Sequence, residues 1–203
     1  MNVYFGGIVI LSLSYLLGSV PTGYILCRVF RSIDIREHGS KSIGATNVGR
    51  VAGKRLWIAT LVLDILKGFI AVALLPVIIN ENVTMAKVIC TIGVVAGHNW
   101  TIFLRFQGGK GIATTAGALI GFAPLVFLSS LLVWGLVFTL SRFISLASIV
   151  SAVFLPVFMF LYGEPITIQM LGVVVAVLAI VRHKDNIKRL LKGQESKFAF
   201  AKR

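Results

Sequence analysis

The first segment whose residues could do chemistry is a glycine-rich stretch at residues 36–50, with the sequence REHGSKSIGATNVGR. Glycines let successive backbone amides point into one concavity, hydroxyl groups donate to phosphate oxygens, and arginine supplies a bidentate charged donor. Residues of these types include Gly39, Ser40, Thr46 and Arg50. The stretch is typical of an anion-binding loop, although an ordinary surface loop could share its composition.

A second segment, FQGGKGIATT at residues 106–115, places the pattern Gly-Gly-Lys-Gly before an expected helix start. Backbone amides and the Lys110 ammonium would favour an anion there, as would the helix dipole. The pattern is not a Walker A motif, because Leu104 and Gly111 stand where that motif needs Gly and Ser or Thr. A tight loop between packed helices is the simpler interpretation of this pattern taken alone.

A third segment, RHKDNIKRLL at residues 182–191, follows the last apolar stretch. His183 and Asn186 are three residues apart, so we expect them on one helical face. His183 could act as a base, an acid or a hydrogen-bond donor. A helix rich in Lys and Arg at a membrane interface also serves as a headgroup anchor, and this segment alone favours that role.

Two kinds of catalytic site are missing from the pattern. The acidic residues Asp34, Glu37, Asp64, Asp185 and Glu195 form no paired motif of the kind that holds Mg²⁺ or Zn²⁺, so a metal-dependent phosphotransferase is disfavoured. An acyltransferase dyad of the His-x4-Asp type needs Asp five residues after a His. Ile43, Phe103 and Lys188 occupy those positions.

The composition shows where these segments must sit. The 203 residues are 57% hydrophobic and only 13% charged, whereas a soluble surface needs about a quarter charged residues. We therefore predict an integral membrane protein of the all-α polytopic class. Long uncharged or nearly uncharged stretches cover residues 3–27, 56–79, 88–104, 111–141, 143–163 and 165–181.

The basic residues decide the topology. The stretch 111–141 is long for one span of about 17 to 25 residues and tight for two. A turn near residues 121–124 places 18 of the 20 Lys and Arg on one side, as the positive-inside rule requires. We predict about seven transmembrane helices in a single domain, 1–203, with the amino terminus outside and the carboxyl terminus cytoplasmic. The expected cytoplasmic segments are residues 28–55, 105–111 and 141–143 and the tail 182–203.

Polar residues inside the stretches need partners, because an isolated charge in a membrane is costly. Asp64 and Lys67 are three residues apart in the second stretch, and we expect a structural ion pair that ties helices together. His98 and Asn99 lie near the middle of the third stretch. We expect both to be buried and hydrogen-bonded.

Six short motifs in series resemble the bacterial acyl-phosphate:glycerol-3-phosphate acyltransferase family, over residues 18–197. They are GSVPTG at 18–23, GS at 39–40 with GATN at 44–47, Asp64 with KG at 67–68, GHN at 97–99, GGKG at 108–111, and RH at 182–183 with Asn186. The family pattern has Gly-Ser-Gly-Asn where this chain has Gly-Ser-Lys-Ser at 39–42, which adds a cation and removes an amide side chain. The sequence GQESK at 193–197 is similar to the family's Gly-Thr-Glu-x-Lys segment.

The resemblance implies transfer of a fatty acyl group from acyl phosphate to the 1-hydroxyl of sn-glycerol 3-phosphate. The products would be phosphate and 1-acylglycerol 3-phosphate, or lysophosphatidic acid, in the first step of phospholipid synthesis. It also implies the bacterial inner membrane, contact with membrane lipids, and an active site that faces the cytoplasm. Because the acyl phosphate donor is an activated mixed anhydride, the resemblance implies that no metal and no cofactor are required.

By position, the resemblance implies that Ser40, Arg50 and Lys110 bind phosphate, while His183 and Asn186 hold the polar end of a substrate. The further substrate-binding residues are Gly39, Thr46, Asn47, Gly108, Gly109, Gly111 and Glu195. We expect direct attack of the glycerol hydroxyl, with His183 or a substrate phosphate oxygen as the base. Attack through a Ser40 acyl-enzyme is the alternative route.

Two other functional classes remain as alternatives. A secondary transporter of organic phosphates would also use glycine-interrupted helices and intramembrane charges, but it needs ligands on both sides of the membrane. A structural subunit of a larger membrane complex would tolerate alanine at Ser40, Arg50 and Lys110. Nucleic-acid binding is disfavoured, because spans separate the basic residues and no exposed aromatic platform accompanies them.

Overall fold

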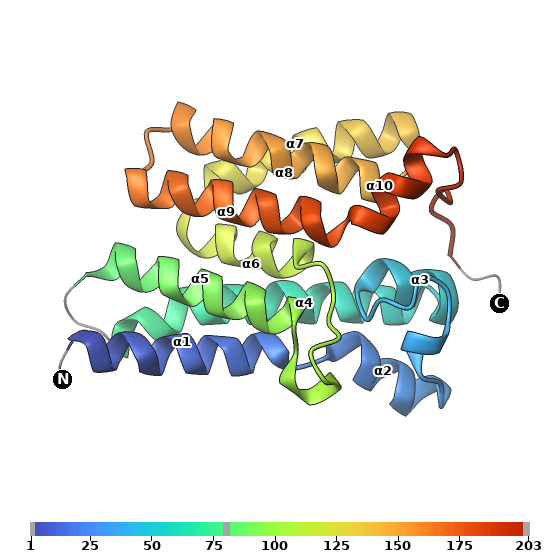
Figure 1. Cartoon of the computed structure of the whole chain (residues 1–203), viewed down its shortest axis with the longest axis horizontal. Helices are drawn as coiled ribbons and strands as arrows, with labels where there is room; N and C mark the ends of the chain where they lie inside the picture. Colours follow the sequence, from blue (N-terminus) through green and yellow to red (C-terminus); the bar gives the residue numbers. More distant parts are fainter. Residues whose placement is uncertain (1–2, 79–81, 201–203) are drawn as a thin grey trace. The chain divides into compact units, whose positions relative to one another are not determined.

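The computed structural model describes residues 3–78 and 82–200, and within those ranges the chain contains helices and no strands (Figure 1). This confirms the all-α class. Residues 79–81, in an expected outer connection, and 201–203, which include two counted basic residues, lie outside the described ranges. The elements are α1 (Val3–Ser19), α2 (Thr22–Arg31), η1 (Ile35–Glu37), α3 (Ala45–Ala52), α4 (Lys54–Leu74), η2 (Leu75–Ile78), α5 (Val83–Asn99), η3 (Ile102–Leu104), α6 (Ile112–Phe122), α7 (Pro124–Ser141), α8 (Ile144–Leu161), α9 (Ile166–Arg182) and α10 (Lys184–Leu191).

The helices are long and apolar enough for a multi-pass membrane protein. Among the residues that the structure describes, five helical segments qualify as spans by length and composition, and the pair α9 and α10, bent by 59°, is a sixth candidate. Helix α6 has 11 residues, or about 16 Å, against a hydrocarbon core of about 30 Å. The expected turn within 121–124 is confirmed, because α6 ends at Phe122 and α7 starts at Pro124. Seven spans and the orientation of the termini stay predictions.

The described residues form two compact units. The first contains the chain up to Ala118 together with 199–200, and the second is Leu119–Phe198. In the first unit α1 packs along α5, as Figure 1 shows in blue and green. A methyl group at Gly18 would collide with the Val94 carbonyl, so small residues allow these two backbones to approach closely. The single domain predicted from the sequence stays a prediction.

The stretch 3–27 corresponds to one candidate span, Phe5–Arg31, but its helix is interrupted. Helix α1 ends at Ser19 and α2 begins at Thr22, with Val20 and Pro21 between them. Proline has no backbone N–H and its ring clashes with the preceding turn, which explains the break. His98 and Asn99 are the last two residues of α5, inside the candidate span Val83–Leu104.

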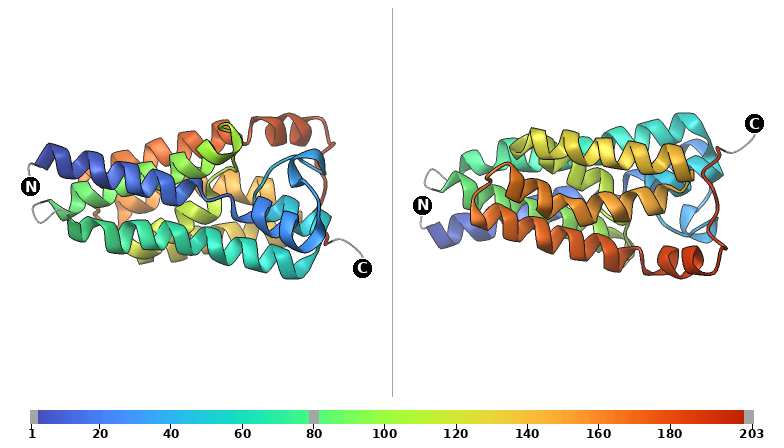
Figure 2. Two further views of the ribbon diagram at one scale, coloured as in Figure 1. Left: turned by 90° about the horizontal axis from the view of Figure 1, so that it is seen from below. Right: turned by 90° about the horizontal axis from the view of Figure 1, so that it is seen from above.

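In the second unit α8 packs against both α7 and α9, and Figure 2 shows these consecutive helices side by side. The Trp134 indole donates a hydrogen bond to the Ser148 hydroxyl over 3.2 Å, which ties α7 to α8. Gly172 of α9 lies against the Met159 side chain of α8. The first turn of α8 carries Ser145, and the start of α10 carries Asn186, two polar residues of this unit.

Candidate active site

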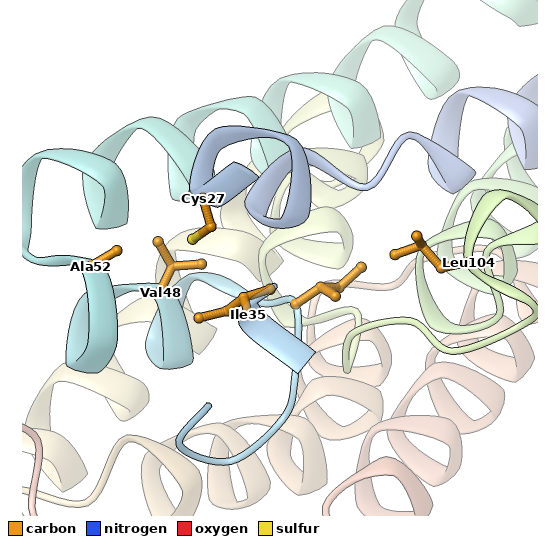
Figure 3. Packing of buried hydrophobic residues seen from close by; sticks show 6 residues of the cluster. Cys27, Ile35, Val48, Ala52 and Leu104 are labelled. Carbon is orange, nitrogen blue, oxygen red and sulfur yellow. The ribbon is translucent and has the colours of Figure 1, made fainter. Parts of the chain in front are cut away.

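The expected loop at residues 28–55 is a folded layer rather than an open loop. It contains the end of α2, the short helix η1 and the two-turn helix α3. Apolar side chains from these elements pack together in the cluster shown in Figure 3, whose labelled members are Cys27, Ile35, Val48, Ala52 and Leu104. Since this cluster is buried, the backbone that carries the glycine-rich stretch is fixed against α2 and η3.

The Asn47 side chain holds the loop together from inside. The two hydrogens of its amide nitrogen are shared among the carbonyls of Ile35, His38 and Ser42, at 3.3, 3.0 and 2.9 Å, and its amide oxygen accepts from the Ser40 N–H over 2.9 Å. The residue is only 1% exposed. Asn47 therefore organises the loop, and its direct contact with a substrate stays a prediction.

The exposed part of the loop is bent so that it can present Ser40. Gly39 and Lys41, on either side of it, have φ of 57° and 59°, in the left-handed region. Gly39 has no substitute there, because a methyl group would also collide with the Asn47 amide oxygen. Ser40 is exposed, and Arg50 is half-buried in the last turn of α3. Thr46, in the first turn of α3, is half-buried as well.

Asp34 and Arg36 support the start of the same loop. The Asp34 carboxylate caps η1 by accepting from the Arg36 N–H over 3.0 Å and pairs with the Arg36 guanidinium at 2.6 Å. These hydrogen bonds to Arg36 lower the pKa of Asp34 to about 2. The Arg36 guanidinium also lies over the Tyr24 ring, 5.0 Å from its centroid. The loop entrance is thus tied to α2.

The Gly-Gly-Lys-Gly segment is packed onto the end of α5. The Gly109 N–H donates to the His98 carbonyl over 2.9 Å, and methyl groups at Gly108 and Gly109 would collide with the His98 backbone and ring. Gly111 has φ of 81°, and a methyl group there would lie 2.9 Å from the Asn99 amide oxygen. The Gly109 amide therefore serves the fold, while half-buried Lys110 lies between the packed glycines and the start of α6.

The side chain of Asn99 lies next to the Gly-Gly-Lys-Gly segment. The residue is fully buried, yet neither polar atom of its side-chain amide has a hydrogen-bond partner among the described residues. The expectation that Asn99 is buried is confirmed. The expectation that its side chain is hydrogen-bonded is wrong among the residues that the structure describes. A buried amide without partners next to a glycine segment and a lysine suits a polar ligand.

In the second unit the buried Glu195 side chain gathers polar partners around it, as Asn47 does in the first loop. One carboxylate oxygen accepts from the Ser145 hydroxyl over 2.9 Å and from the Asn186 amide over 2.8 Å, and the other accepts from the Arg189 guanidinium over 2.7 Å. Burial raises the pKa of Glu195, but these three hydrogen bonds outweigh it and the net pKa is lowered. Glu195 thereby fixes the tail to α8 and α10.

His183 lies at the bend between α9 and α10, so the single helical face expected for His183 and Asn186 is interrupted. His183 is the residue before α10, and its carbonyl accepts from the Ile187 N–H over 2.9 Å. Its ring is buried, with Nδ1 2.7 Å from the Ala179 carbonyl. Because a carbonyl only accepts, Nδ1 carries the proton, and Nε2 is the basic nitrogen of the neutral ring.

The candidate residues thus fall into three groups on separate scaffolds. The first loop carries Gly39, Ser40, Thr46, Asn47 and Arg50, the end of α5 supports Gly108, Gly109, Lys110 and Gly111, and the second unit carries His183, Asn186 and Glu195. Sequence reasoning missed Ser145 and Arg189 as partners of Glu195, because no local pattern links residues 50 and 6 positions away. The assignment of each candidate as catalytic or substrate-binding stays a prediction.

Comparison with known proteins decides the family. The family model described as glycerol-3-phosphate acyltransferase matches residues 8–193. The chain belongs to the glycerol-3-phosphate acyltransferase family. Among curated members of this acyltransferase family, the protein of Desulforudis audaxviator is 44% identical, covering 96% of this chain and 97% of its own. The member from Fusobacterium nucleatum is 38% identical, covering 93% and 96%.

Solved acyltransferase structures match the fold. Two crystal structures of PlsY (YgiH), an integral membrane glycerol 3-phosphate acyltransferase, are 35% identical to this chain. The glycerol 3-phosphate form has a TM-score of 0.89 and covers 95% of this chain and 96% of that one. The lysophosphatidic acid form has a TM-score of 0.87 and covers 95% of each. This acyltransferase therefore shares the integral membrane fold over nearly its whole length.

Proposed function

We propose that this acyltransferase moves a fatty acyl group from acyl phosphate to the 1-hydroxyl of sn-glycerol 3-phosphate. The hydroxyl oxygen forms an ester bond to the acyl carbon, and the bond from that carbon to the phosphate oxygen breaks. The hydroxyl proton passes to a base, and inorganic phosphate leaves. The product is 1-acylglycerol 3-phosphate, a lysophosphatidic acid, in the first step of phospholipid synthesis.

The observation that carries this proposal is the pair of PlsY structures. They were solved in a glycerol 3-phosphate form and a lysophosphatidic acid form, which correspond to the acceptor and the product of the proposed reaction. The match covers 95% of this chain at 35% identity in both cases. The acyl phosphate donor is the finer part of the proposal and rests on the sequence resemblance.

The geometry of the first unit supports binding of phosphate groups. Arg50 and Lys110 supply positive charge, exposed Ser40 supplies a hydroxyl, and buried Asn99 supplies an amide without a partner among the described residues. In the proposed mechanism the two cations stabilise the leaving phosphate and the negative charge that develops on the carbonyl oxygen. Fixed donors do this well because their scaffold is already folded before the substrate arrives.

The base is His183 or a phosphate oxygen of a bound substrate. The Nδ1 contact with the Ala179 carbonyl supports the first choice, because it leaves Nε2 as the basic nitrogen. If His183 is the base, His183→Gln lowers kcat by about 10²- to 10⁴-fold. A variant with unchanged kcat and raised KM instead assigns His183 to binding. Acyl label trapped on Ser40 after quenching would overturn direct transfer.

We further place the enzyme in the bacterial plasma membrane with the candidate residues facing the cytoplasm. The charge distribution supports this, since the basic residues gather on alternate connections. The native thiols of Cys27 and Cys90 are buried, so an engineered thiol gives a clean labelling signal. In intact spheroplasts an impermeant maleimide should label Glu164→Cys but reach Lys192→Cys only after the membrane is opened. The reverse pattern contradicts the orientation.

The activity is tested with purified protein in lipid, given palmitoyl phosphate and glycerol 3-phosphate in the presence of a chelator. We expect phosphate release and lysophosphatidic acid formation, both lost in Arg50→Ala. Arg55→Ala is the matched control, because Arg55 is an exposed arginine at the start of α4 with no candidate role. Turnover that stops with chelator and returns with a divalent metal would contradict the metal-free mechanism.

The alternatives predict different results in the same protein. A secondary transporter of organic phosphates gives no lysophosphatidic acid but exchanges labelled glycerol 3-phosphate across sealed vesicles in a counterflow assay. A structural subunit gives neither signal and tolerates alanine at Ser40, Arg50 and Lys110. Absence of turnover in folded protein therefore overturns the proposed function rather than leaving it open.

A further inference from the structure

A cluster of buried polar side chains in the first unit has no part in the mechanism proposed above. At its centre is Asp64 of α4, which is 1% exposed. One oxygen of its carboxylate, Oδ1, accepts a hydrogen bond from the Thr22 hydroxyl over 2.7 Å and lies 2.9 Å from the Lys67 ammonium. The same oxygen lies 3.6 Å from Nδ1 of His98. Three helices, α2, α4 and α5, thus meet at one oxygen atom, and the ion pair expected from the sequence is confirmed.

One side of this cluster supports the first loop. Thr22 is the first residue of α2, and the Lys67 ammonium also donates to the Val20 carbonyl over 3.0 Å, at the break before that helix. The next residue, Gly23, touches the loop directly, because a methyl group there would collide with the Ile43 carbonyl. Asp64 and Lys67 therefore fix the helix on which the loop with Ser40 rests.

The other side supports the Gly-Gly-Lys-Gly segment. The His98 ring reaches Asp64 on one side, and on the other it lies where a methyl group at Gly109 would fall. The His98 carbonyl accepts from the Gly109 N–H over 2.9 Å. The position of Lys110, the next residue, thus depends on how His98 is held.

Stability alone does not account for such a cluster. Burying an ion pair costs desolvation energy, and replacing one by apolar residues of similar volume is often neutral or stabilising. Charges within a membrane are more costly still and are a mark of functional sites. What Asp64 provides that apolar side chains cannot is one carboxylate oxygen that accepts from the Thr22 hydroxyl and lies 3.6 Å from the His98 ring. These two residues lead to the two segments that both supply candidate phosphate ligands.

We propose that Asp64 is a positioning residue of the active site, which sets the first loop and the Gly108–Gly111 segment relative to each other through Thr22 and His98. A displacement of about 1 Å at such a site lowers activity about 10²-fold. The inference rests on the proposed function for its effect on turnover, but the positional effect itself is measurable without substrate.

The decisive variant is the double substitution Asp64→Leu with Lys67→Met. Asp64→Leu alone leaves the Lys67 ammonium buried without a counter-charge and is expected to prevent folding. The double variant removes both charges and keeps the approximate volume. Thr60→Val is the matched control, because the Thr60 hydroxyl is also buried in α4 but bonds only to the Leu56 carbonyl of its own helix.

We expect the double variant to recover a wild-type Tm in detergent while kcat/KM stays reduced about 10²-fold. Amide exchange followed by mass spectrometry should be faster at residues 108–111 and 39–47 than in wild type, and unchanged in Thr60→Val. A purely structural ion pair makes the opposite prediction: once Tm is restored, activity and exchange are restored too. That result would overturn the inference.

Single variants test each side of the cluster if the double variant does not fold. Thr22→Val should speed exchange in the first loop, and His98→Gln should speed it at residues 108–111, each with about a tenfold loss of kcat/KM. If each variant changes the exchange rates of residues 39–47 and 108–111 to the same extent, the positioning role is contradicted. Wild-type protein that folds but shows no turnover overturns the proposed function, whereas the exchange pattern still decides the role of Asp64.

Discussion

The two units each organise a polar segment around a single buried side chain, but they use different chemistry. In the first loop Asn47 donates to three carbonyls and accepts from one N–H. In the second unit Glu195 only accepts, from the side chains of Ser145, Asn186 and Arg189. A segment that folds back on its own backbone needs a neutral group with both capacities, whereas side-chain donors are gathered best by a carboxylate.

This difference separates two kinds of sensitivity. The hydrogen bonds of the Asn47 side chain involve no titratable group, so protonation does not change them directly. The Glu195 centre depends on a charge, and its lowered pKa links it to protonation. Four measurements can distinguish the two centres.

Asn47→Ala should have the largest effect. It removes one hydrogen bond each from the carbonyls of Ile35, His38 and Ser42 and from the Ser40 N–H, although the Ile35 and His38 carbonyls keep backbone N–H donors. We expect the loss to cost about 3 kcal/mol of stability and about 10²-fold in kcat/KM. Thermal unfolding in detergent and steady-state kinetics measure the two. Asn82→Ala is the control, because Asn82 caps α5 through the Met85 N–H outside the site. Equal kcat/KM losses in both variants would remove the special role of Asn47.

Gly39→Ala tests the same centre from its other side. The left-handed backbone costs an alanine about 1 kcal/mol, and the added methyl group collides with the Asn47 amide oxygen. Gly163→Ala is a matched control, since Gly163 has φ of 68° with no atom within 4 Å of an added methyl group. We expect both variants to lose stability and only Gly39→Ala to lose activity. Unchanged turnover in Gly39→Ala would mean that the loop adapts without Asn47.

Glu195→Gln should be milder, because the amide oxygen still accepts from one or two of the donors. The Arg189 guanidinium then faces an uncharged group, and since it is 37% exposed in its side chain, water screens the loss. We expect a decrease of about 1 kcal/mol in the free energy of unfolding. Glu164→Gln, in the α8–α9 connection, is the control. A loss as large as that of Asn47→Ala would contradict the proposed ranking of the two centres.

The pH dependence should show the smallest difference. A carboxyl group with a lowered folded pKa contributes stability above its unfolded pKa of about 4.3, and this is lost as pH falls through the folded pKa. Wild type should therefore lose more stability than Glu195→Gln between neutral pH and pH values below 4. Asp34 titrates in both proteins and cancels in the difference. Asn47→Ala should differ from wild type by the same amount throughout.

Hydropathy and charge gave reliable predictions at the level of helices. The 111–141 stretch was divided at the right place because the positive-inside rule constrains every connection at once, and the structure has its break at Ala123. The break at Val20 and Pro21 and the helix α3 were missed. An uncharged stretch is equally apolar whether or not a proline interrupts it, and a two-turn helix leaves too short a pattern to stand out.

At the candidate site the sequence identified the types of residue but not the hydrogen-bond partners of their side chains. Gly39, Asn47, Gly109 and Glu195 were all expected to bind substrate. That role stays a prediction for each of them, and the structure adds contacts within the protein. The amide of Asn47, the N–H of Gly109 and the carboxylate of Glu195 form internal hydrogen bonds, and Gly39 lies against Asn47. Asp64 was expected to pair with Lys67, yet its contacts with Thr22 and His98 had no signal in the sequence.

The sequence by itself determined that this chain resides in a membrane and which family it resembles, because composition and motif order are properties of the chain alone. Only the tertiary structure shows which polar groups are hydrogen-bonded or ion-paired within the protein. Each donor and acceptor has a limited capacity, and the folded backbone brings its partners together from distant positions, as Asp64 is contacted by both Thr22 and His98, which are 76 positions apart.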